Sequence, residues 1–257
     1  MTKLDALKKK QQAKAAKEHK QMSEQKAVAT QKEAGALAIS TDQMEDWGSA
    51  AEISAKDIVI PKIWTMQGLS DFVTEGKAKL GDYVNSVTGE ILSDYKKGEL
   101  EFVPFHMIKL WYEFENGEFK GVVALNSVNE DLPYEEGSIT RSKVFQFFVL
   151  LTSELEKGSA IPYVLQFTRT SLQAGKVLAT QMYMQNKMAG LPPAGMAFKL
   201  SGTLEKNDKG SFVVNQVQKS RQVTQSELEA AYNWFKTVRS DKSIKVDGDA
   251  KTEEIPF

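Results

Sequence analysis

The sequence predicts an α+β protein built on an antiparallel β-sheet or small barrel, with one internal helix and one C-terminal helix. Three observations support this fold class. Strand-length runs rich in aromatic and β-branched residues recur along the chain, Asn116-Gly117 marks a hairpin turn between two of them, and amphipathic helical patterns in the globular part are confined to residues 171–188 and the segment after Thr224. Because strands and helices do not alternate regularly, the pattern does not favour a doubly wound parallel sheet.

The strands are predicted from short apolar runs bounded by turn residues. Asn-Gly supplies the positive φ angles of a two-residue hairpin, and residues 207–210 give a second hairpin signal. Pro61 interrupts the first run and suits an edge position or a strand start. The expected strands are residues 58–64, 100–105, 106–114, 119–125, 144–151, 161–168, 197–204 and 211–217.

Two helices are predicted. Residues 171–188 carry apolar side chains at roughly helical spacing and end before a Gly-Leu-Pro-Pro sequence. Thr224 and Glu227 match a capping box, in which each residue bonds the other's backbone N–H. The helix that follows has an apolar face of Leu228, Ala231, Tyr232 and Phe235.

Composition divides the chain into four parts. Residues 1–40 form a lysine-rich, helix-prone arm, 41–55 a linker, 56–240 a globular domain and 241–257 an acidic disordered tail. For the arm, two readings remain open: a solubilising extension, or a contact with phosphates or with the chain's own acidic tail.

Several function classes are excluded by composition. The formal net charge is −1, there is no cysteine and there are two histidines, so disulfides, thiolate nucleophiles and Cys/His zinc sites are ruled out. No apolar run is long enough to cross a bilayer, which predicts a cytoplasmic protein without a membrane partner. The loop at Gly76 lacks the Walker A spacing, and no catalytic constellation or cofactor motif is found. We therefore expect a protein that is not an enzyme and needs no cofactor.

The C-terminal residues carry the most specific motif. Four acids precede the apolar tip, and the sequence ends Asp247, Asp249, Glu253, Glu254, Ile255, Pro256, Phe257. This ending resembles the acidic tails of bacterial and phage single-stranded DNA-binding proteins, which finish in an Asp-Ile-Pro-Phe type tip. The alternative is a chance ending on a flexible terminus. The resemblance covers the tail alone, although the size and layout of the body look like phage-encoded versions.

The resemblance implies both a function and a fold. It implies sequence-independent binding and protection of single-stranded DNA during phage replication, recombination and repair, in the cytoplasm of a bacterial host. Phe257 would anchor the tail in an apolar pocket on replication or recombination proteins, with Pro256 and Ile255 beside it and the acids steering the approach. It also implies that the domain is an OB-fold-like barrel.

Basic and aromatic residues interleave in the predicted strands, as single-strand binding requires, because bases stack on rings while cations follow the phosphates. Lys62 and Trp64 lie two apart and share a strand face, whereas Trp111 and Tyr112 face opposite sides, so Trp64 is the favoured platform. The competing interpretation is that at least half of these rings are core residues. The candidate DNA-binding residues are Lys62, Trp64, Lys77, Lys79, Tyr83, Lys109, Trp111, Tyr112, Arg141, Lys143, Phe147 and Arg169.

Two rival functions fit the sequence. A single-strand annealing recombinase would also bind DNA but would accelerate pairing of complementary oligonucleotides. A virion or scaffold protein would use the Lys/Ala/Gln-rich arm for assembly and would show no salt-sensitive DNA binding. The sequence leaves open whether the chain forms a homo-oligomer.

Overall fold

The protein is represented by a computed structural model that describes residues 59–97, 100–125, 129–208, 210–240 and 245–246. All of these residues belong to the unit that spans residues 51–257. The predicted arm (1–40) and linker (41–55) lie outside the described residues, as does the tail apart from residues 245–246.

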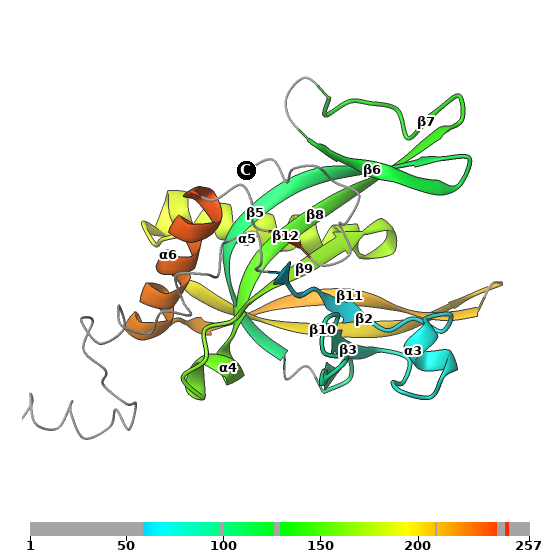
Figure 1. The fold of residues 1–257 in the computed structure, drawn as a ribbon. Helices are drawn as coiled ribbons and strands as arrows, with labels where there is room; N and C mark the ends of the chain where they lie inside the picture. Colours follow the sequence, from blue (N-terminus) through cyan, green and yellow to red (C-terminus); the bar gives the residue numbers. More distant parts are fainter. Residues whose placement is uncertain (1–58, 98–99, 126–128, 209, 241–244, 247–257) are drawn as a thin grey trace, which may run out of the picture. The chain divides into compact units, whose positions relative to one another are not determined.

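A seven-stranded sheet forms the centre of the described residues (Figure 1). Five of its strands follow the order β11-β10-β5-β8-β7, while β6 pairs with β5 and β9 pairs with β8, and every pairing is antiparallel. Among the strands that the structure describes, this order does not close into a barrel. The α+β class is therefore confirmed, in the form of an open sheet. The strands are β5 (Leu100–Glu115), β6 (Glu118–Ala124), β7 (Glu135–Glu136), β8 (Ile139–Leu151), β9 (Pro162–Thr168), β10 (Met196–Asn207) and β11 (Gly210–Gln222).

Both predicted hairpins are confirmed. Asn116 and Gly117 adopt φ angles of 52° and 86° between β5 and β6, the left-handed values that a two-residue turn requires. The second hairpin joins β10 to β11, with Asn207 opposite Gly210 at its end. Local turn chemistry thus sets the register of four of the seven strands.

Two helices cover opposite faces of the sheet: α5 (Leu172–Ala189) and α6 (Gln225–Ser240). Successive side chains of β8 alternate between two cores, so that Phe147 packs in the core that contains α5 while Phe148 packs in the core that contains α6. Since both faces are covered, β8 reads in the sequence as a continuous apolar run instead of an alternating one.

Smaller elements flank the main sheet. Pro61 splits the first predicted strand into β1 (Val59–Ile60) and β2 (Ile63–Thr65). Strand β2 begins a three-stranded antiparallel sheet in the order β2-β3-β4, and β1 pairs in parallel with β12. The remaining bounds are α3 (Asp71–Thr74), β3 (Asp82–Asn85), β4 (Ile91–Asp94), α4 (Thr152–Glu156), the 3₁₀ helix η2 (Arg169–Ser171) and β12 (Lys245–Val246).

A close approach seats α5 on the sheet. A Cβ atom added at Gly175 would lie 2.8 Å from Cβ of Phe167 and 3.0 Å from Cβ of Phe145, so only glycine allows the helix to lie this near β8 and β9. Strand β9 leads through η2 directly into α5, and this packing therefore fixes the position of the turn that carries Arg169.

Candidate functional site

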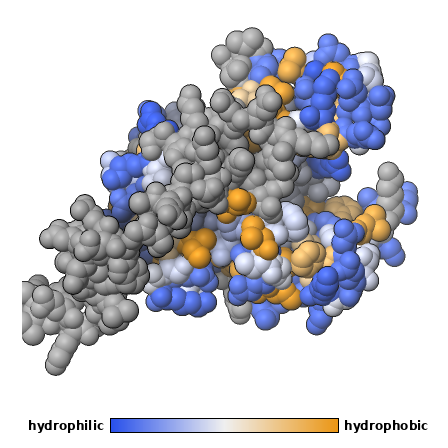
Figure 2. Space-filling model, in the orientation of Figure 1, coloured by the Kyte–Doolittle hydropathy of each residue, from blue (hydrophilic) through white to orange (hydrophobic). Residues whose placement is uncertain are grey.

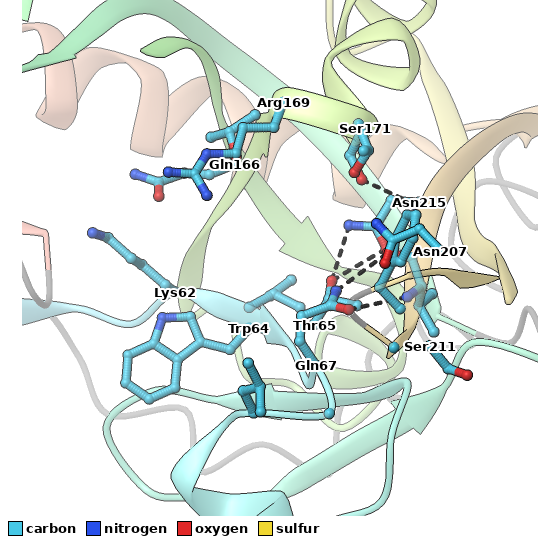
Figure 3. A pocket seen from close by; sticks show the side chains of 18 residues that line it. Lys62, Trp64, Thr65, Gln67, Gln166, Arg169, Ser171, Asn207, Ser211 and Asn215 are labelled. Atoms are coloured by element: carbon cyan, nitrogen blue, oxygen red, sulfur yellow. Dashed lines mark hydrogen bonds between the residues drawn. The ribbon is translucent and has the colours of Figure 1, made fainter. Parts of the chain in front are cut away.

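A groove of about 770 Å³ opens between β2, the end of β9 and the β10–β11 hairpin (Figure 3). Its lining includes two cations, Lys62 and Arg169, and the indole of Trp64, and none of the lining residues that the structure describes is acidic. Three of the twelve candidate DNA-binding residues thus meet at one site. The other lining residues are Ile63, Thr65, Gln67, Gly68, Leu69, Gln166, Thr168, Thr170, Ser171, Asn207, Gly210, Ser211, Phe212, Val213 and Asn215.

Trp64 and Lys62 both line the groove, although Lys62 is only 7% exposed. Alternation along β2 turns Ile63 into the core and leaves Trp64 outward, 37% exposed, with Phe72 supporting the indole edge-on at a centroid distance of 6.4 Å. The backbone N–H of Lys62 donates to Ser86 Oγ at 2.8 Å, which fixes the chain at that point. Figure 3 shows the Lys62 side chain reaching toward Gln166, on the side where Arg169 lies.

Arg169 stands at the turn between β9 and α5. Its φ of 47° lies in the left-handed region, which is uncommon for a residue with a side chain. The side chain is exposed and lines the groove, and no ion pair involves it within the part of the chain that the structure describes. This guanidinium is therefore available to an anion that enters the groove.

The floor of the groove is a set of polar groups that satisfy one another. The Asn215 amide donates to Thr65 Oγ1 at 2.9 Å, and its backbone N–H donates to Ser171 Oγ at 3.0 Å. Gln67 bonds both backbone groups of Val213, at 3.0 Å and 3.2 Å. Because these bonds join β2, η2 and β11, they hold the three walls in place before any ligand arrives.

Five more candidates lie on β5 and β8 and do not line the groove. Tyr112 is half-buried and accepts a hydrogen bond of 2.6 Å from Gln166 Nε2, so it stands behind the groove wall. Trp111 is only 1% exposed. Hydrogen bonds to Glu113 and Glu136 hold Arg141 and raise its pKa above the ordinary value. The other two are Lys109 and Lys143, both half-buried.

A second hollow of about 310 Å³ adjoins this part of the sheet. Arg169 lines both the groove and this second hollow, so the two are neighbours. The residues that line the second hollow are Phe114, Tyr134, Thr140, Arg141, Ser142, Lys143, Arg169 and Leu172.

The remaining candidates do not reach the groove. Tyr83 and Phe147 are fully buried, so their rings pack in the core and offer no stacking surface; burial also raises the pKa of Tyr83. Lys77 and Lys79 are exposed in the loop after α3, where Lys77 pairs with Glu75 at 2.6 Å. The tail residues Asp247, Asp249, Glu253, Glu254, Ile255, Pro256 and Phe257 lie outside the described residues.

Sequence reasoning missed the third wall of the groove. The β10–β11 hairpin was predicted as a structural element, but its contribution of Asn207, Ser211 and Asn215 to the groove was not. Asn215 is 150 residues from its partner Thr65, and no local pattern signals a contact over that separation.

The chemistry of the site favours binding of an anionic, ring-containing ligand. Within the described ranges no group of three or more His, Cys, Asp or Glu side chains is placed to hold a metal ion. Nor does any helix in those ranges combine the length and apolar character that a bilayer crossing requires. What the groove offers is two cations, an accessible indole and a rigid polar floor.

Fold and site together define an α+β protein whose open antiparallel sheet carries a basic, aromatic groove. Residues 29–243, most of the chain, match the family model described as Pam3 phage gp34-like protein. The chain belongs to this phage-derived family. No curated protein and no solved structure matches the chain.

Proposed function

We propose that this protein binds single-stranded DNA without sequence preference, with the groove as its primary site. The observation that carries the proposal is the presence of Trp64, Lys62 and Arg169 around one groove, with no acidic residue among the described residues that line it. A base would stack on the indole while the cations neutralise adjacent phosphates, and neither contact reads sequence.

The size and rigidity of the groove support this function. A volume of about 770 Å³ falls within the range of small-ligand sites, about 300–1,000 Å³, and accommodates a nucleotide unit of a longer strand. A closed OB-type barrel is not needed, because open antiparallel sheets also present stacking rings to single strands. Binding would involve no catalytic step.

The acidic C-terminal segment extends the proposal to protein partners. Its resemblance to the tails of single-stranded DNA-binding proteins supports recruitment of replication, recombination or repair proteins through Phe257, with the four acids as steering charges. Binding would then protect exposed strands while the tail brings in the proteins that process them.

Fluorescence titration with oligothymidine tests the proposal. Trp64→Ala should weaken binding by about 1–3 kcal/mol, roughly 5- to 150-fold, because base stacking on a ring contributes that much. Trp64→Phe should retain most of the affinity. Tyr232→Ala is the matched control, since Tyr232 is an exposed ring on α6 and does not line the groove.

Two results would contradict the proposal. One is that Trp64→Ala leaves the affinity for oligothymidine unchanged, or that Tyr232→Ala lowers this affinity as much as Trp64→Ala does. The other is equal affinity for duplex and single strands, because the groove offers a stacking surface that paired bases do not reach.

A further inference from the structure

An acidic loop covers the second group of candidate DNA-binding residues. This acidic loop, residues 129–136, connects the part of the chain after β6 to β8 and includes β7. It contains Glu130, Asp131, Glu135 and Glu136. On the face shown in Figure 2, hydrophilic side chains dominate the end of the sheet that carries β6 and β7.

Oxygen atoms of the acidic loop contact three cations of the sheet. The Glu130 carboxylate lies 3.6 Å from Lys109 Nζ, and the Glu130 carbonyl accepts from Lys143 Nζ at 3.4 Å. Arg141 donates to the Pro133 carbonyl at 3.2 Å and to the Glu136 carboxylate at 2.9 Å. Each of these cations therefore already has the kind of oxygen partner that a phosphate would supply.

The same loop covers the ring between these cations. Tyr134 packs edge-on against Trp111 with centroids 5.5 Å apart, and Trp111 Nε1 donates to the Asn129 carbonyl at 2.9 Å. Lys143 Nζ lies 4.9 Å from the centroid of the Trp111 ring. Beneath the loop is thus the same combination as in the groove, a ring with cations beside it.

This surface continues from the groove. Arg169 lines the groove and also the second hollow, whose other walls include Tyr134, Arg141 and Lys143. A strand that leaves the groove past Arg169 would next meet the edge of the acidic loop.

We propose that Lys109, Trp111, Arg141 and Lys143 form a second binding surface for the same DNA strand, which the acidic loop occupies in the free protein. The inference rests on the proposed function of the groove. A strand long enough to pass Arg169 displaces the loop, and its phosphates replace the oxygens of Glu130 and Glu136 as partners of the cations. Glu113 stays with Arg141, because it belongs to β5 and not to the loop.

The loop contacts are weak enough to exchange. Lys109 and Glu130 are 38% and 49% exposed, and an ion pair between exposed groups contributes only about 0–1 kcal/mol. Glu136 is 60% exposed; its partner Arg141 is 7% exposed but keeps its bond to Glu113 when Glu136 leaves. Several phosphates of one strand can therefore compete with them, whereas a short oligonucleotide held in the groove alone cannot.

The experiment compares oligothymidines of about 4 and about 20 nucleotides, the shorter being at the lower end of known single-strand site sizes. The test variant combines Glu130→Gln and Glu136→Gln. Its matched control combines Glu90→Gln and Glu156→Gln, which changes net charge equally at exposed positions away from the loop. The test variant should bind the longer strand several-fold more tightly than the control, with no difference on the shorter one. Lys143→Gln should weaken binding of the longer strand only.

The outcomes separate the two proposals. If Trp64→Ala weakens binding but test and control variants behave alike on the longer strand, the second surface is wrong and the groove stands. A gain on the shorter strand that equals the gain on the longer one also contradicts the inference. If Trp64→Ala has no effect on either strand, the proposed function of the groove itself is wrong. Thermal unfolding of both double variants checks that the fold is unchanged.

Discussion

Arg169 carries a backbone conformation that glycine adopts more readily than arginine. A non-glycine residue in the left-handed region costs on the order of 1 kcal/mol, and such residues cluster at functional sites. Arg169 is also the residue shared by the groove and the second hollow. We infer that this left-handed conformation serves to place the Arg169 guanidinium between the groove and the second hollow.

Replacing Arg169 should therefore separate stability from binding. Arg169→Gly should leave the free energy of unfolding unchanged or raise it by up to about 1 kcal/mol, because the strain is relieved, while oligonucleotide affinity falls. Arg169→Lys keeps the charge and the strain, so it should lose less affinity and gain no stability. Urea unfolding and fluorescence titration measure the two effects. A clear loss of stability in Arg169→Gly would show that the Arg169 side chain stabilises the fold, which would contradict the inference that it is placed for ligand binding.

At the level of single residues, the sequence predicts exposure only where one sheet face is open. Lys62 and Trp64 both line the groove, but only Trp64 is exposed, at 37%, whereas Lys62 is 7% exposed. Phe147 and Tyr83 were assigned to a binding surface but lie in the core, since both faces of their strands are covered. The sequence of such a strand is a continuous apolar run, so it does not indicate which face an aromatic side chain points to.

At the level of elements, the start of α6 is held by the predicted capping box. Thr224 N–H donates to Glu227 Oε2 at 2.7 Å, and Glu227 N–H donates back to Thr224 Oγ1 at 3.3 Å. Arg221 adds two hydrogen bonds to the same carboxylate, at 2.7 Å and 2.9 Å. These contacts, led by the bonds from Arg221, lower the pKa of Glu227 from its ordinary value of 4.5 to about 2.

This lowered pKa predicts an acid-sensitive contribution to stability. The folded state holds the Glu227 proton less tightly than the unfolded state, so the contribution is complete above about pH 4.5 and is lost as the pH falls toward about 2. Glu227→Gln should cost about 2 kcal/mol at neutral pH, since hydrogen bonds to a charged group are removed. Urea unfolding at about pH 7 and about pH 3 should show the two proteins converging in acid. An equal difference at both pH values would contradict the assignment.

Elements and hairpins set by local chemistry were predictable, and the pairing of strands distant in sequence was not. The turn at Asn116, the capping box at Thr224 and the helix over 172–189 all follow from residues close in sequence. The pairings of β10 with β5 and of β5 with β8 join strands far apart in the chain, and β12 is too short to leave an apolar pattern. The sequence consequently predicted the fold class and an antiparallel sheet or small barrel, but not the strand order or the three walls of the groove.

At the level of the whole molecule, the distribution of charge matters more than its sum. The net charge of −1 gives no general attraction for nucleic acid, yet the described part of the groove lining holds two cations and no acid. Binding should therefore depend on a small, countable number of phosphate contacts.

Salt titration counts those contacts. For a short oligothymidine held by Lys62 and Arg169, a plot of log affinity against log salt should have a slope of about −1.4, from about −0.7 per phosphate contact on single strands. A longer strand should give a steeper slope, because Lys109 and Lys143 join once the acidic loop is displaced. Affinities that do not change with salt concentration would contradict the proposal that Lys62 and Arg169 bind phosphates in the groove.

The pairing of β5 with β8 has a further consequence. This one ladder runs from Phe102 opposite Leu151, deep in the core, to Glu115 opposite Ile139 at the far end. Burial declines along this pair of strands. The hydrogen bonds near Phe102 and Leu151 therefore open only when the protein unfolds, whereas those near Glu115 and Ile139 open at a much smaller free-energy cost. The acidic loop is attached to the Glu115 and Ile139 end of the two strands. This end of the sheet can therefore rearrange around a ligand while the rest of the sheet remains closed.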